Sequence, residues 1–129
     1  MAGYVTNIES RTLENDNFRE VLFTAPGVQL VLMTIGVGDE IGLETHDDVD
    51  QFIRVESGAG KAILDGEEHE LEDGSAVVIP RGTEHNIVNV SKSEPLKLYS
   101  IYTPPEHPDG TVHRTKAEAD AYEREHHHK

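Results

Sequence analysis

Glu44, His46 and Gln51 are spaced so that their side chains can share one space inside a β-structure. Glu44 and His46 are two residues apart, and alternate residues of an extended strand point to the same face. In the run that follows, Gln51 shares a face with Ile53, so a polar amide is expected among apolar side chains. Such buried polar groups are costly unless something satisfies them, and a cation held by oxygen and imidazole ligands does so. His85 would complete this set from a second hairpin.

Short β-strands are the elements that must position these side chains. Asp65-Gly66 follows the run at residues 61–64 and favours a two-residue type I′ hairpin turn. No helix-forming segment lies between the runs, so a parallel α/β fold is excluded and an all-β antiparallel sandwich or barrel is expected. The predicted strands cover residues 21–24, 29–35, 51–56, 61–64, 76–79, 86–90 and 96–103.

The chain divides into three segments on this interpretation. Residues 1–20 form an N-terminal arm, in which the polar stretch 7–17 is expected to be a loop or an outer strand. Residues 21–103 form the barrel. Residues 104–129 form a Pro-rich loop, a short helix and a His-rich tail, and the loop is too rich in Pro for a central strand.

The C-terminal helix has a recognisable start. Thr115 and Glu118 have the spacing of a capping box, which predicts a helix as far as about Glu125. The run from His126 to His128 is interpreted as a frayed tail or a cloning remnant, and it is set aside. His69 lies among glutamates and is interpreted as a solvated surface residue.

The residues around the first three candidates resemble a known family motif. Gly38, Glu44, His46, Gln51 and Gly58 have the spacing of the first motif of the cupin superfamily. In that motif a glycine precedes two His one residue apart, a Glu and a closing glycine.

A second stretch resembles the second cupin motif at every fixed position. Gly74, Pro80, Gly82, His85 and Asn89 stand at its spacings, and the two motifs follow each other in the expected order. The short segment between them is similar to that of small single-domain bacterial cupins. Asn89 is expected to bond backbone in a turn, and Pro80 and Gly82 to shape the hairpin that presents His85.

The resemblance implies a cupin-type jelly-roll β-barrel of two antiparallel sheets that holds a divalent metal ion: Zn, Mn, Ni or Fe. Glu44 takes the place of the family's first His, His46 is its second His, Gln51 replaces its Glu, and His85 is the His of the second motif. The set resembles that of zinc-dependent phosphomannose isomerases with the Glu and Gln positions exchanged. If Gln51 binds weakly, the remaining two-His-one-carboxylate set suits Fe(II) and O₂ chemistry.

Several other residues are candidates for the surroundings of the metal. Tyr102 is an alternative to Tyr99, because the sequence does not fix the parity of that strand. His107 and His113 are interpreted either as exposed loop residues or as groups that cover the barrel mouth. The expected apolar wall of the substrate pocket consists of Met33, Ile53, Ile87, Tyr99 and Ile101.

Composition narrows the classes of partner. The 129 residues include 11 Lys and Arg against 25 Asp and Glu, a net charge of -14 that argues against nucleic acid. Cysteine is absent, which excludes thiol nucleophiles and zinc-thiolate fingers. No apolar run is long enough to span a membrane and no signal peptide is recognised, so we expect a soluble, unprocessed, cytoplasmic protein. The net charge and the scattered Arg54, Lys61, Arg81 and Lys97 argue against a phosphorylated sugar as substrate.

The leading hypothesis is therefore a metal-dependent cupin that acts on a small polar or sugar-like molecule in an isomerase-like reaction. An Fe-dependent oxygenase is the enzymatic alternative. A barrel that binds a metal or small ligand without catalysis is a second class, and a purely structural dimer is a third. A homodimer formed through an outer strand is expected in each case.

Overall fold

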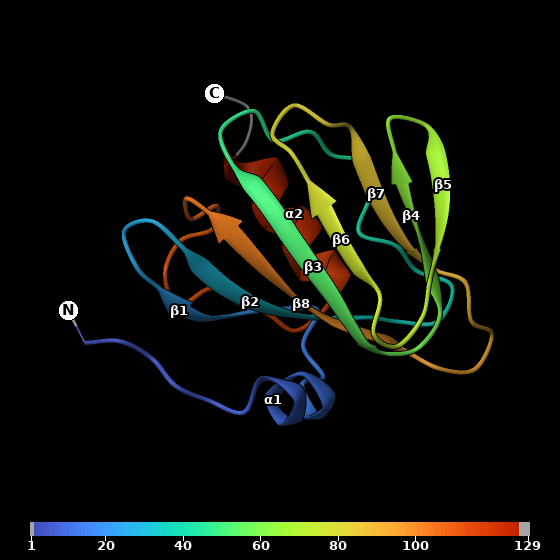
Figure 1. Cartoon of the computed structure of the whole chain (residues 1–129), viewed down its shortest axis with the longest axis horizontal. Coiled ribbons are helices and arrows are strands. Elements are labelled where there is room, and N and C mark those ends of the chain that lie inside the picture. The colour runs from blue at the N-terminus through green and yellow to red at the C-terminus, as the bar shows by residue number, and fades with distance from the viewer. Residues whose placement is uncertain (1, 127–129) are drawn as a thin grey trace.

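The computed structural model describes residues 2–126, in which nine strands and two helices follow one another (Figure 1). His127 and His128 of the predicted tail lie outside the described residues. The elements are α1 (Ile8–Glu14), β1 (Arg19–Thr24), β2 (Gln29–Ile35), β3 (Asp50–Ser57), β4 (Gly60–Leu64), β5 (Glu67–Leu71), β6 (Ala76–Ile79), β7 (His85–Asn89), β8 (Leu96–Thr103), β9 (Val112–His113) and α2 (Lys116–His126).

The strands form two antiparallel sheets, as expected for a jelly-roll barrel. The larger sheet has the order β6-β3-β8-β2-β1-β9, and the smaller has the order β5-β4-β7. Figure 1 shows the smaller sheet beside the β3–β6 end of the larger one. Apolar side chains from both sheets make one buried core, which includes Val31, Ile53, Ile87 and Leu98.

The predicted hairpin at Asp65-Gly66 is confirmed. Both residues have positive φ, 48° at Asp65 and 83° at Gly66, as a type I′ turn requires. The turn joins β4 to β5, whose registered pairs run from Leu64↔Glu67 to Gly60↔Leu71.

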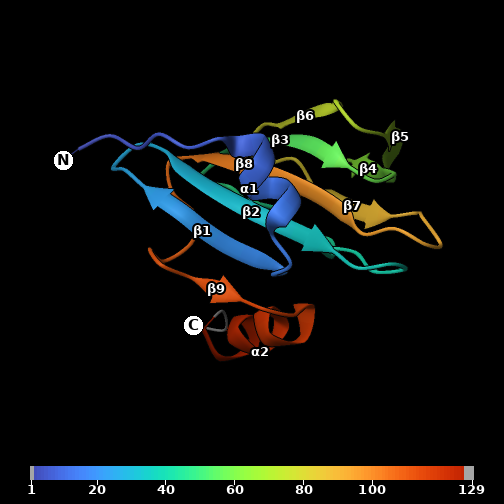
Figure 2. The same ribbon diagram turned by 90° about the horizontal axis from the view of Figure 1, so that it is seen from below.

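The N-terminal stretch corrects one prediction. Residues 8–14 form helix α1 and not a loop or an outer strand. Asn7 is its N-cap and accepts a hydrogen bond from the Ser10 amide at 3.0 Å, the preferred role of Asn at a helix start. Figure 2 shows α1 lying over the outer face of the larger sheet, across β2 and β8.

The C-terminal helix agrees with its prediction. The Thr115 hydroxyl accepts a hydrogen bond from the amide of Glu118, and α2 extends to His126. Figure 2 shows α2 next to β9, on the side of the molecule away from α1. Within residues 2–126, no helix is long and apolar enough to cross a membrane.

Candidate metal centre

The segment between β2 and β3 holds Glu44 and His46 against the smaller sheet. It is not the continuous strand that the two-residue spacing suggested, but an irregular segment with isolated bridges to β7. Glu44 and His85 exchange two backbone hydrogen bonds, of 2.9 and 2.8 Å, and the Gly82 amide donates to the His46 carbonyl at 2.7 Å. These bonds place both motifs side by side although they are far apart in the sequence.

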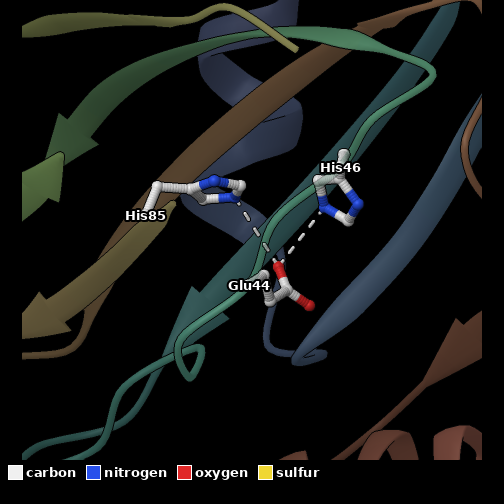
Figure 3. A group of neighbouring side chains, drawn as sticks. All are labelled: Glu44, His46 and His85. Carbon is white, nitrogen blue, oxygen red and sulfur yellow. Dashed lines mark ion pairs between the residues drawn. The ribbon is translucent and has the colours of Figure 1, made fainter. Parts of the chain in front are cut away.

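Three ligand-type side chains converge at this point. One donor atom each from Glu44, His46 and His85 lie within 4.8 Å of one another. Oε1 of Glu44 is 3.5 Å from Nε2 of His46 and 3.8 Å from Nε2 of His85, and the three side chains face one another in Figure 3. Two imidazole nitrogens and a carboxylate oxygen form a set that suits a transition-metal ion or Zn²⁺.

Both imidazoles are oriented from behind. Nδ1 of His85 lies 2.9 Å from the Thr83 carbonyl oxygen. A carbonyl can only accept, so Nδ1 carries the hydrogen and the lone pair of Nε2 faces the cluster. Nδ1 of His46 lies 3.3 Å from the carboxylate of Glu106, an arrangement that outer partners of metal-bound His commonly adopt.

The charges within the cluster support one another. Burial acts to raise the pKa of Glu44, but the hydrogen bond and charge of His46 and the charges of Arg19 and His85 outweigh it, so this pKa is lowered. The hydrogen bond to Glu44 raises the pKa of His46 against the effect of burial, and the charge of Glu106 adds to the rise. Glu44 is therefore ionised at neutral pH, as a metal ligand must be.

Gln51 points into the barrel, as predicted, because it alternates with outward residues of β3. It is 4% exposed, and its Nε2 donates to the hydroxyls of Ser100 and Tyr102 at 3.2 and 3.1 Å. Its Oε1 is buried without a hydrogen-bond partner among the described residues. A buried amide oxygen without a hydrogen-bond partner can serve as a metal ligand, so the chemistry of Gln51 is compatible with the fourth position that the resemblance implies.

The Pro-rich segment after β8 is tied to the barrel by Gln29. Oε1 of this fully buried side chain accepts hydrogen bonds from the amides of Glu106 and His107 at 3.1 and 3.0 Å. Its Nε2 donates to the carbonyl of His107 at 2.7 Å. These hydrogen bonds hold the backbone of Glu106 in the position from which its carboxylate contacts His46.

Tyr102 and His107 form a neutral polar pair behind the cluster. The Tyr102 hydroxyl lies 3.5 Å from Nε2 of His107, and the Tyr102 ring meets the His46 ring edge-on at 6.3 Å. Burial raises the pKa of Tyr102, and the charge of Arg19 partly opposes this rise. Burial lowers the pKa of His107 to about 3, and the charge of Arg19 adds to this decrease. His107 is thus half-buried against the barrel and not an exposed loop residue.

A cavity of about 310 Å³ opens at this end of the barrel. Glu44, His46 and Glu106 contribute to its wall, so two of the candidate ligands, Glu44 and His46, are reachable from solvent. The complete lining consists of Leu43, Glu44, Thr45, His46, Glu106 and Glu123.

Of the five residues predicted to form the apolar wall of the pocket, three face the interior of the barrel and two face outward. Met33, Ile53 and Ile87 are at most 1% exposed and belong to the core. Tyr99 and Ile101 are corrected, because β8 buries Leu98, Ser100 and Tyr102 and so turns the alternate residues to the outer face of the sheet. The strand parity that the sequence left open thus selects Tyr102 for the interior.

Arg19 and Glu106 also belong to the surroundings of the cluster, although neither was predicted from the sequence. Arg19 is the first residue of β1 and is 4% exposed, with its guanidinium 3.4 Å from Nδ1 of His113. The spacing of Arg19 and Val21, two apart at the start of an apolar run, would have indicated that Arg19 faces inward. No sequence signal places Glu106 against His46, because Gln29 sets that contact through the backbone of a distant loop.

Comparisons with known proteins agree with this architecture. Residues 31–102 match the Cupin_2 family model, described as a cupin domain. The uncharacterized protein YrkC of Bacillus subtilis is 48% identical over 126 residues, which cover 93% of this chain and 67% of YrkC.

Solved structures are similar to the chain as well. The crystal structure of BH2720 from Bacillus halodurans has 48% sequence identity and a TM-score of 0.90, and the match covers 93% of this chain and 95% of that one. The structure of KdgF from Halomonas sp. has 25% identity and a TM-score of 0.64, covering 68% of this chain and 78% of KdgF.

Proposed function

The chain belongs to the cupin domain family, and on this premise we propose that it binds one divalent metal ion and acts on a small polar organic molecule. Glu44, His46 and His85 hold the ion, with Gln51 as a fourth ligand. The observation that carries the proposal is the convergence of three ligand atoms within 4.8 Å, with both imidazoles oriented from behind.

A divalent metal in this site supplies a Lewis acid that polarises a carbonyl or hydroxyl oxygen of a bound substrate. His85 keeps its Nε2 free for the ion because Thr83 holds the proton on Nδ1. Glu106 faces Nδ1 of His46 from behind, and its charge balances part of the positive charge of the site. Glu44 is ionised and Nε2 of His85 faces the cluster, whereas the raised pKa of His46 means that a bound metal has to displace a proton from His46.

The chain also offers a hydroxyl group that keeps its proton and can orient a substrate. The hydroxyl of Tyr102 is protonated at neutral pH because burial raises its pKa. His107 beside it is neutral, because burial lowers its pKa. The Tyr102 hydroxyl can therefore donate a hydrogen bond to a substrate oxygen, whereas the base of an isomerase-like reaction needs a pKa closer to neutral than that of either group.

An Fe-dependent oxygenase is the second candidate function. It is favoured by the two-His-one-carboxylate composition of the cluster, which leaves positions open if Gln51 stays bonded to Ser100 and Tyr102. The identity of the bound metal separates the two reactions. Zn, Mn or Ni favours isomerase screening, and Fe favours assays of O₂ uptake.

The proposal is tested by metal titration of protein whose His126–His128 run is replaced by Ser, so that the run cannot bind metal. We expect about one equivalent of metal per chain. E44A, H46A and H85A should each weaken zinc binding at least 100-fold, and Q51A by about tenfold. H69A, which removes a surface His, is the matched control and should leave the affinity unchanged.

Two results would contradict the proposal. The first is a protein that binds no metal after purification and reconstitution with each of the four metals. The second is an affinity that H69A lowers as much as H85A. Turnover of no substrate by a fully metal-loaded protein would leave the metal site intact and favour the non-catalytic binding barrel.

A further inference from the structure

Arg19 brings a positive charge into the interior of the barrel. It shares the inward face of β1 with Val21, and only 4% of it is exposed. Cζ of its guanidinium lies 5.3 Å from the centroid of the Phe18 ring, and Nη1 is 3.4 Å from Nδ1 of His113. Neither neighbour carries a negative charge that would compensate the guanidinium.

The guanidinium is incompletely satisfied. Its Nε is buried and has no hydrogen-bond partner, and no carboxylate of residues 2–126 lies within the 4.0 Å of an ion pair with Arg19. A buried charge without a partner is costly, and Arg presents a planar fork of donors that matches an oxyanion. The arrangement indicates a position for an anionic ligand.

This charge lies close to the candidate metal centre. Burial is the main influence on the pKa values of Tyr102 and His107, and the charge of Arg19 is the next. The same charge also contributes to the lowered pKa of Glu44. Arg19, Gln51 and Tyr102 are buried, inward-facing residues of β1, β3 and β8, so Arg19 shares the barrel interior with the candidate fourth ligand.

The charges near Arg19 favour a carboxylate over a phosphate. Burial lowers the pKa values of His107 and His113, so both are neutral at pH 7 and Arg19 is the charged group among the three. Glu44 adds a negative charge nearby. A phosphate monoester carries about 1.5 to 2 negative charges at this pH, more than one guanidinium balances.

We propose that Arg19 binds the carboxylate of an organic acid substrate whose second polar group reaches the metal centre. This inference rests on the proposed function, and the buried charge of Arg19 favours an organic anion although the whole chain carries a net charge of -14. Arg19 then orients the substrate and sets specificity, and it excludes neutral sugars as the preferred ligands.

The test is calorimetric titration of metal-loaded protein with malonate, succinate, glutarate, the monoamide succinamate and inorganic phosphate. We expect one of the dicarboxylates to bind most tightly, and R19Q to weaken its binding about 10- to 100-fold. Succinamate has a single carboxylate, for which Arg19 and the metal compete, so R19Q should weaken its binding less than that of succinate. R54Q, which removes an arginine on the outer face of β3, should change neither affinity.

R19K keeps the charge without the fork and should fall between the wild type and R19Q. If R19Q does not fold, R19K carries the comparison. Metal content is measured in the same samples, so a protein without metal reports failure of the proposed function. In that case the anion site is tested separately: glutarate binding to wild type and R19Q is measured after treatment with 1,10-phenanthroline, a metal chelator without carboxylates.

Equal dicarboxylate affinity of wild type, R19Q and R54Q in folded, metal-loaded protein would overturn the inference. Tighter, Arg19-dependent binding of phosphate than of every dicarboxylate would also overturn it, since the class would then be phosphates.

Discussion

Replacing Glu106 by Gln is expected to weaken metal binding about tenfold without altering the ligands themselves. The carboxylate of Glu106 lies 3.3 Å from Nδ1 of His46, and the two side chains are 28% and 16% exposed. A hydrogen bond to a charged group contributes about 1.5 to 3 kcal/mol, and the partial exposure of this pair places its loss at the lower end. A loss of about 1.4 kcal/mol corresponds to a tenfold change in affinity.

The assay is competition for zinc against a chromophoric chelator at pH 7, with the His126–His128 run replaced. E123Q is the matched control, because Glu123 lines the same cavity and acts on His46 by its charge alone. We expect E123Q to change the affinity less than threefold. The reasoning is refuted if E106Q and E123Q lower the zinc affinity equally, because a shared loss of charge would then explain both.

Three further predictions concern stability, measured by urea unfolding. A Cβ at Gly60 would lie 2.7 Å from the Val88 carbonyl oxygen, so G60A should lower the free energy of unfolding by about 1 to 3 kcal/mol. G36A is the control: a Cβ at Gly36 would have no neighbour within 4 Å, and the free energy of unfolding should change by less than about 0.5 kcal/mol. I53A removes a fully buried side chain and should cost about 2 to 5 kcal/mol, and a cost below about 1 kcal/mol would contradict the packing. The pKa of His107 is lowered from 6.5 to about 3, so its contribution to stability is full above pH 6.5 and is lost as the pH falls toward 3. Metal-free wild type should therefore lose about 1 to 2 kcal/mol more than H107Q between pH 7.5 and 5, and parallel losses would contradict the burial of a neutral His107.

The seven strands predicted from the sequence correspond to β1–β4 and β6–β8, and three of the four candidate ligands converge, while β5 and β9 were not among the predicted strands. Alternation with period two placed Gln51 and Ile53 inside, and the Asp65-Gly66 turn fixed the register of β4 and β5. Glu44 and His46 reach the same space although their segment is irregular, because bridges to β7 hold it in place. A homodimer and a cytoplasmic location remain predictions.

The surroundings of the metal centre were harder to predict. Glu106 and His107 take their positions from backbone hydrogen bonds to Gln29, which is more than seventy residues away in the sequence. Local spacing carries no information on such a contact. Tyr99 was misplaced because a one-residue change of register exchanges the two faces of a strand.

The most direct test of the central claim is anomalous scattering at the metal absorption edge, recorded from crystals of metal-loaded protein with the His126–His128 run replaced. We predict one strong peak at about 2.0 to 2.2 Å from Nε2 of His46, Nε2 of His85 and a carboxylate oxygen of Glu44. A fully loaded protein whose peak lies away from these atoms, or crystals with no peak among them, would contradict the account.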